Sequence, residues 1–190
     1  MQKLIELDHR IFFFINGKMQ NHFFDLVLPV VRNPKTWIPL YVALFIFLIW
    51  KFGKQGWLMI LFAVINVGIT DQLSAGILKP LVHRLRPCNN PALLMKVHSL
   101  IDCGAGYSMC SSHAANHFGL AIFFSVIFGK QYPWIIYASV AWAGVISLSQ
   151  VYVGVHYPAD ITIGALIGIA SGYGMGKLCL RFINKQNTAE

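Results

Sequence analysis

The sequence predicts an all-α membrane protein, a polytopic bundle of about five transmembrane helices preceded by an N-terminal interfacial helix. Of its 190 residues, 56% are hydrophobic and only 12% are charged, and the mean hydropathy is +0.59. Soluble domains carry roughly 25% charged residues, so this chain has too few to cover a water-facing surface of its size. Long apolar stretches recur along the chain, which is typical of proteins that cross a bilayer several times.

The N-terminal segment, residues 4–15, is predicted to be an amphipathic helix lying in the plane of the membrane interface. Its apolar side chains recur at helical spacing: Leu4, Leu7, Ile11 and Phe14. The charged residues between them make the segment too polar to span a bilayer. A second short apolar piece, residues 23–31, stops at Asn33 and Pro34. Acidic residues occur near the start, so a signal peptide is not expected.

Five apolar segments are predicted to cross the membrane, at about residues 36–50, 57–82, 111–128, 132–153 and 159–180. We interpret residues 1–190 as one domain, with interfacial helices over 1–35, a helical bundle over 36–180 and a cytoplasmic tail over 181–190. Five crossings put the residues before 36, the loop 83–110 and the turn 154–158 on one side. The opposite side carries Lys51, Lys54, Lys130, Lys177, Arg181 and Lys185. The positive-inside rule therefore predicts that this opposite side is cytoplasmic.

The net charge of +8 does not indicate nucleic-acid binding, because no Lys/Arg tract with interleaved aromatic residues occurs. The expected partners are the phospholipid bilayer and an anionic substrate.

Four glycines follow a strict four-residue spacing in the last apolar segment: Gly164, Gly168, Gly172 and Gly176. Such a stripe lets a neighbouring helix approach closely. It predicts either packing within the monomer or a homodimer.

Three polar clusters are expected on one membrane face. The first runs from Lys79 through Arg84 to Arg86 and Pro87, at the end of the second crossing. Its cations could be interfacial anchors. Alternatively, they bind phosphate oxygens, which a planar guanidinium can do through two hydrogen bonds.

The second cluster, Ser111, Ser112 and His113, opens the third crossing. Serine before an apolar run is typical of a helix N-cap, and a helix N-terminus is also an anion site. The third cluster begins at Ser149 and Gln150. It continues to His156 and Asp160, where a carboxylate can orient an imidazole for nucleophilic attack.

Together these stretches resemble the signature of the type 2 phosphatidic acid phosphatase family, which is related to the vanadium-dependent haloperoxidases. The family pattern is KxxxxxxRP, then PSGH, then SRxxxxxHxxxD. The chain matches the first motif completely, and it matches the others at Ser111, His113, Ser149, His156 and Asp160. The matching motifs span residues 79–160.

The resemblance implies a membrane lipid phosphatase that works without a metal or other cofactor. His156, oriented by Asp160, would attack phosphorus and form a phosphohistidine. His113 would protonate the leaving oxygen. The phosphate-binding residues would be Lys79, Arg86, Ser111 and Ser112, with Gln150 and Arg84 as further candidates.

The chain departs from the family pattern at three positions. Cys110 replaces a proline and Ser112 a glycine, and Gln150 replaces the arginine of the third motif. Losing that charge-assisted contact would cost about 1.5–3 kcal/mol. Arg84 is the cation expected to compensate.

The motifs account for phosphate binding, but they do not identify the lipid that carries the phosphate. Candidate substrates are undecaprenyl pyrophosphate and a phosphate of lipid A, at the outer face of a bacterial inner membrane. The alternatives are a lipid-to-lipid phosphotransferase and a non-catalytic lipid-binding protein.

Two further features remain open in the sequence. Cys88 and Cys103 share one loop and are either disulfide-bonded or free. Asp71 lies within the second crossing and serves either a structural contact or, indirectly, the site.

Overall fold

The computed structural model describes residues 2–187 and confirms the all-α prediction, because these residues form helices and loops and no strand. Within residues 2–187, four helical stretches are long and apolar enough to cross a membrane: Pro34–Phe52, Lys54–Asn89, Trp134–Tyr152 and Pro158–Gln186. A shorter apolar helix, Ser112–Phe128, runs among them.

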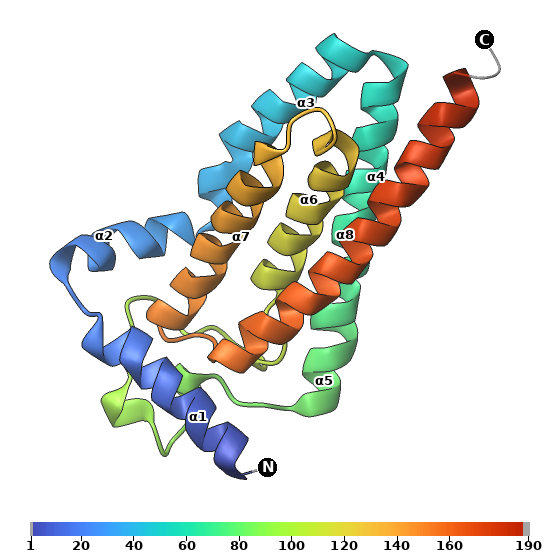
Figure 1. Ribbon diagram of the computed structural model, residues 1–190. Coiled ribbons are helices and arrows are strands. Elements are labelled where there is room, and N and C mark those ends of the chain that lie inside the picture. Colours follow the sequence, from blue (N-terminus) through green and yellow to red (C-terminus); the bar gives the residue numbers. More distant parts are fainter. Residues whose placement is uncertain (1, 188–190) are drawn as a thin grey trace.

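The N-terminal elements lie at one end of the bundle (Figure 1). They are α1 (Gln2–Phe13), the π-helical turn η1 (Phe14–Lys18), α2 (His22–Val31) and the 3-10 turn η2 (Pro34–Trp37). The predicted apolar face of the first helix is exposed, whereas Asp8 and Phe12 on its other side are buried. This arrangement suits a helix that exposes one apolar face to lipid and packs against the protein through Asp8 and Phe12.

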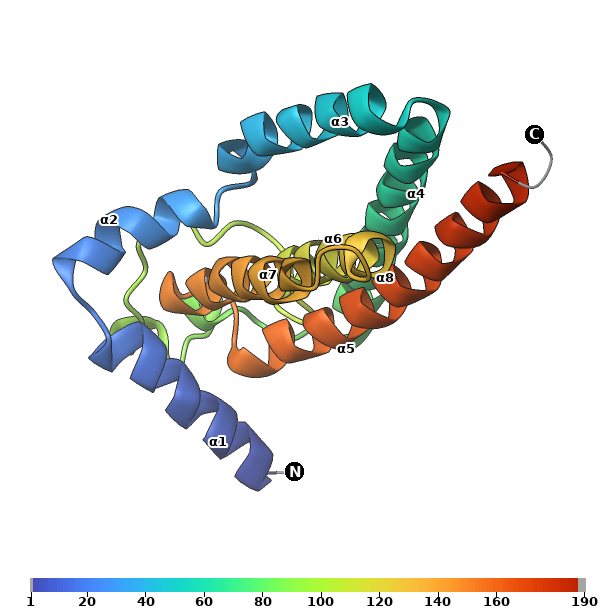
Figure 2. The ribbon, with the colours of Figure 1, turned by 45° about the horizontal axis from the view of Figure 1, so that its top comes forward.

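The bundle consists of α3 (Ile38–Phe52), α4 (Lys54–Asp71), η3 (Gln72–Leu78), α5 (Lys79–Val82), α6 (Ser112–Phe128), α7 (Trp134–Tyr152) and α8 (Pro158–Asn187). α4, the π-helical η3 and α5 follow one another without a loop. Figure 2 shows α6 surrounded by α4, α7 and α8, with α3 farther out. α6 therefore forms the centre of the bundle, and the residues at its start are held from three sides.

The glycine stripe of α8 faces α6 within the same chain. A Cβ atom on Gly172 would come within 2.2 Å of the carbonyl oxygen of Gly119, and one on Gly168 within 2.3 Å of the carbonyl oxygen of Ala115. Added Cβ atoms on Gly164 and Gly176 would also be too close, at 2.5 Å from the carbonyl oxygen of Ser111 and 2.8 Å from Cβ of Val126. This supports the packing interpretation. The homodimer has no support, because the stripe is covered by α6 and a second copy cannot reach it.

The three polar clusters lie together at one end of the bundle, opposite the end that carries the tight connections. The turn between α3 and α4, the loop between α6 and α7 and the end of α8 lie at one end (Figure 1). The three polar clusters lie at the other end, beside α1, as the five-crossing topology requires. α8 continues past the expected end at residue 180 to Asn187. Residues 188–190 of the expected tail lie outside the described part of the chain.

A buried asparagine ties the long loop to the bundle. Asn16, in η1, donates hydrogen bonds to the carbonyl oxygens of His98 (2.8 Å) and Tyr152 (2.7 Å), and its side-chain oxygen accepts one from the amide of His98 (2.9 Å). Cys88 and Cys103 form a disulfide within the same loop, with their Cα atoms 5.8 Å apart. These contacts hold the loop over the end of the bundle where the polar clusters meet.

Candidate active site

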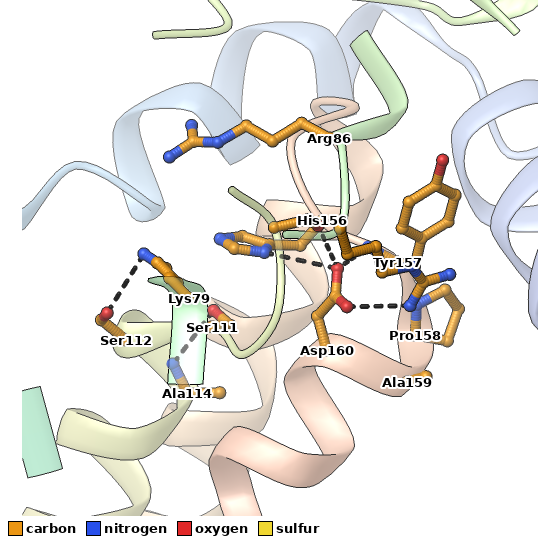
Figure 3. Close-up of polar contacts among 12 residues, drawn as sticks. Lys79, Arg86, Ser111, Ser112, Ala114, His156, Tyr157, Pro158, Ala159 and Asp160 are labelled. Carbon is orange, nitrogen blue, oxygen red and sulfur yellow. Dashed lines mark hydrogen bonds and ion pairs between the residues drawn. The ribbon is translucent and has the colours of Figure 1, made fainter. Parts of the chain in front are cut away.

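The three clusters converge at the end of the bundle next to α1 (Figure 3). They contribute Lys79, Arg86, Ser111, Ser112, His156 and Asp160. Figure 3 shows His156 between Asp160 on one side and the two cations, Lys79 and Arg86, on the other. The structure thus brings together residues that lie up to 81 positions apart in the chain.

The His156–Asp160 pair is buried where α8 begins. Pro158 starts that helix, which places Asp160 in its first turn. Oδ2 of Asp160 lies 3.6 Å from Nδ1 of His156, slightly beyond hydrogen-bond distance. The same oxygen accepts hydrogen bonds from the amide of Tyr157 (2.8 Å) and from Oγ of Ser108. Catalytic hydrogen bonds are often long before substrate binds. The pair leaves Nε2 of His156 as the nitrogen that can attack.

Burial lowers the pKa of His156 below its ordinary value, and the nearby carboxylate of Asp160 opposes that shift. Burial disfavours the charged imidazolium. A neutral imidazole with Nδ1 toward a carboxylate is the form that a nucleophile requires.

Arg84 was predicted to bind phosphate, but its guanidinium is paired with two carboxylates of the protein. Its terminal nitrogens donate to Oδ1 of Asp160 (2.9 Å) and to Oδ2 of Asp8 (2.5 Å), and its guanidinium stacks on Tyr157. The structure therefore corrects our expectation that Arg84 compensates for Gln150, because two carboxylates already engage this cation. Arg84 instead holds the carboxylate that orients His156.

Lys79 approaches the start of α6. Its Nζ donates to Oγ of Ser112 (3.3 Å), which also accepts from Oγ of Ser74 (2.9 Å). The predicted N-cap is Ser111, which accepts from the amide of Ala114 (3.4 Å). An anion between Lys79 and this helix end would meet both a fixed charge and the positive end of the helix dipole.

Arg86 is positioned by the long loop. Nη1 of its guanidinium donates to the carbonyl oxygen of Cys103 (2.5 Å), whose side chain is disulfide-bonded to Cys88. The backbone amide of Cys88 in turn donates to the carbonyl oxygen of Gly154 (3.2 Å), beside the turn that carries His156. The disulfide thus fixes the residue on which Arg86 rests.

His113 lies in the first turn of α6. Arg32, His156 and Lys79 are all close enough to act on its imidazole electrostatically. His117, one turn later, donates from Nδ1 to the carbonyl oxygen of His113 (2.8 Å), and their rings are parallel with centroids 6.2 Å apart. His113 therefore lies in the same cationic site as His156, as the motifs predict.

Gln150 is fully buried, and its Oε1 accepts a hydrogen bond from Nε of Arg32 (3.1 Å). Arg32 follows the last residue of α2, so an element outside the three motifs reaches the site. Arg32, Asp8 and Ser108 are not among the site residues that the motifs predict. The predicted topology could have pointed to Arg32 and Asp8, because the residues before 36 were expected on the same side of the membrane as the motifs.

Asp71 points outward, because its side chain is exposed, and its backbone carbonyl accepts from Oγ of Ser74 (3.2 Å). Over residues 2–187, no group of three or more His, Cys, Asp or Glu side chains is placed to hold a metal ion. That phosphate release needs no metal stays a prediction.

The geometry suits phosphoryl transfer, in which positioning and charge stabilisation provide most of the rate enhancement. It defines an integral-membrane phosphatase with a buried histidine facing several cations. Residues 56–187 match the model of the PAP2 superfamily, and the chain belongs to this family.

Similar proteins agree with this assignment. A lipid A 4'-phosphatase of Bacteroides thetaiotaomicron is 33% identical over 192 residues, covering 98% of this chain and 80% of that protein. The lipid A 4'-phosphatase of Porphyromonas gingivalis is 32% identical over 183 residues, covering 95% and 76%. The crystal structure of a transmembrane PAP2-type phosphatidylglycerolphosphate phosphatase from Bacillus subtilis has the same fold, with a TM-score of 0.68 at 18% identity over 97% of this chain and 88% of that one. The prediction of a membrane lipid phosphatase is confirmed.

The contact between α1 and the site yields a prediction for Asp8. Asp8→Asn keeps an oxygen for the amide of Ala159, which donates to Oδ1 of Asp8 at 2.8 Å, but removes one of the two charges shared by Arg84. Arg84 would then neutralise Asp160 more fully and weaken its support of His156. We expect kcat to fall about tenfold with KM little changed.

The matched control is Glu6→Gln, an exposed acidic residue on the same helix. A kcat of Asp8→Asn equal to that of the control would contradict a positioning role for Asp8.

Proposed function

We propose that this phosphatase removes a phosphate group from lipid A, with His156 as the nucleophile. The observation that carries the proposal is the buried His156–Asp160 pair facing Lys79 and Arg86. The choice of lipid is supported by the two lipid A 4'-phosphatases, whose similarity extends over nearly the whole chain.

The reaction proceeds in two displacements. Nε2 of His156 attacks phosphorus, and the bond from phosphorus to the lipid oxygen breaks while His113 protonates that oxygen. Water then attacks phosphorus of the phosphohistidine while His113, now neutral, accepts the proton of that water. The bond from phosphorus to Nε2 of His156 breaks, which releases inorganic phosphate and restores both imidazoles. Lys79, Arg86, Ser111 and Ser112 stabilise the charge on the phosphoryl oxygens.

An apolar cavity beside the site fits a lipid tail. It has a volume of about 360 Å³ and lies between α3, α4 and α6, with Tyr41, Phe45, Val67, Leu120 and Phe124 in its wall. Asn116 and His117 also line it. His117 is one turn from His113, so a tail in this cavity would leave its phosphate group near the cations.

We place the site at the outer face of the inner membrane. The basic residues at the far end of the bundle favour a cytoplasmic position for that end. The disulfide between Cys88 and Cys103 lies at the site end, and disulfides persist in oxidising compartments.

The substrate prediction is tested by phosphate release in detergent from lipid A, undecaprenyl pyrophosphate and phosphatidate, with EDTA present. We expect release from lipid A, and His156→Ala should lower kcat on the order of 10³-fold or more because the nucleophile is lost. His22→Ala, a change at an exposed histidine, is the control.

Release from undecaprenyl pyrophosphate alone would move the assignment to an isoprenoid substrate. Transfer to another lipid without free phosphate would identify a phosphotransferase. Full activity of His156→Ala would refute the proposed nucleophile, and loss of activity in EDTA would refute a metal-free reaction.

The lowered pKa of His156 predicts the acid side of the pH profile. His156 stays neutral as the pH falls through the usual histidine value of about 6.5, so kcat/KM should decline only at a lower pH. Asp160 raises the pKa of His156, so in Asp160→Asn the decline should move to still lower pH. Ionisation of the substrate affects both profiles alike, so the difference between them reports on His156. A shift toward higher pH would contradict this account.

The proposed orientation is tested in spheroplasts. After mild reduction, a membrane-impermeant maleimide should label Cys103, which is partly exposed, whereas Cys88 is buried. The variant with serine at both positions should remain unlabelled. Labelling that requires opened membranes would place the site in the cytoplasm.

A further inference from the structure

The third family motif lacks its arginine in this chain, because Gln150 stands at that position. A neutral amide cannot balance the charge of a phosphoryl group. Arg84, the nearest motif candidate, is engaged by Asp8 and Asp160. The structure offers a different cation at the same place.

Arg32 enters the site from α2. Its backbone amide donates to the carbonyl oxygens of Leu28 and Val30 and so closes the end of that helix. Its Nε donates to Oε1 of Gln150. A guanidinium has five N–H donors, so this bond leaves the two terminal nitrogens for a ligand.

Arg32 lies near two other groups of the site, Arg86 and His113. Burial lowers the pKa of Arg32 first, and the positive charge of Arg86 lowers it further. Arg32 is also close enough to His113 to act on its imidazole electrostatically. Within residues 2–187, no carboxylate forms an ion pair with Arg32.

Several residues of the site carry buried polar atoms that lack a hydrogen-bond partner among the described residues. Nε2 of Gln150, Nε2 of His113 and Nε of Arg86 are buried and have no hydrogen-bond partner within residues 2–187. Gln150 is fully buried. Buried polar groups of native proteins are normally paired, and an anion would pair with several of these groups at once.

We propose that Arg32, oriented by Gln150, binds the phosphoryl oxygens of the substrate and supplies from α2 the charge that the motif arginine supplies elsewhere in the family. The inference rests on the proposed function and deepens it.

The start of α2 is attached to the end of α7, which positions the helix that carries Arg32. Oη of Tyr152, at the end of α7, donates to Oδ1 of Asp25 (2.6 Å) and accepts from the amide of Asn21 (3.3 Å). Gln150 lies on the same last turn of α7. The helix that supplies the cation and the residue that orients it are therefore held against each other before substrate binds, which reduces the entropy cost of ordering the arginine.

The experiment compares Arg32→Gln with Lys35→Gln, a change at an exposed cation three residues away, and with the exchange variant Arg32→Gln/Gln150→Arg. Each purified protein is assayed for lipid A dephosphorylation, for inhibition by inorganic vanadate and for Tm. Vanadate probes the phosphate site without reference to the lipid.

We expect Arg32→Gln to lower kcat/KM and to raise the vanadate inhibition constant, each by about 10- to 100-fold, because a charge-assisted contact is lost. Its Tm should match that of Lys35→Gln. The exchange variant should regain most of the loss, since it returns the cation to the motif position.

Equal kcat/KM and equal vanadate inhibition in Arg32→Gln and Lys35→Gln would overturn the proposal. So would a loss of activity that follows a lowered Tm while vanadate inhibition of the remaining folded enzyme is unchanged, because that result describes a structural residue. Failure of the proposed function looks different: wild-type protein would then release no phosphate, or His156→Ala would remain active. In that case the increase in Tm on adding vanadate would still measure anion binding, and it can be compared between Arg32→Gln and Lys35→Gln.

Discussion

The carboxylate of Asp160 is fully buried, and an ionised carboxylate in such a place is stable only when its oxygens are satisfied. Its partners come from separate parts of the chain: Arg84 and Ser108 from the long loop, the amide of Tyr157 from the turn, and His156 itself. Through Arg84 the same network reaches Asp8 on α1. One buried charge thus fixes α1, the long loop and the start of α8 around His156.

The opposite side of His156 has the reverse problem, because several cations gather where they repel one another. Each is held by a neutral oxygen: Lys79 by Ser112, Arg86 by the carbonyl of Cys103, and Arg32 by Gln150. Hydrogen bonds to neutral acceptors position these cations without cancelling their charge. Phosphoryl transfer gains most from charge that is already in place before the reaction begins.

Close packing of α6 against α8 brings the two sides together. Gly164 lets the backbones meet next to Ser111, whose carbonyl oxygen would lie 2.5 Å from an added Cβ. The amide of Ser111 donates to the carbonyl oxygen of Asp160 (3.1 Å). The start of α6, which carries His113, is thereby joined directly to the first turn of α8, which carries the partner of His156. The glycines are therefore part of the construction of the site.

The sequence by itself determined the class of fold, and it predicted the two histidines, Asp160 and the cations of the first motif as residues of the site. Composition shows whether a chain is surrounded by water or by lipid. Short motifs show which residues act together, because their spacing along the chain is characteristic. The tertiary structure alone decided between alternatives that depend on distant contacts. It directed Arg84 to Asp8 and Asp160, brought Arg32 to Gln150 across 118 positions, and turned the glycine stripe of α8 toward α6. Local sequence patterns do not predict these contacts. The direction of a long charged side chain depends on the partners that folding brings within its reach.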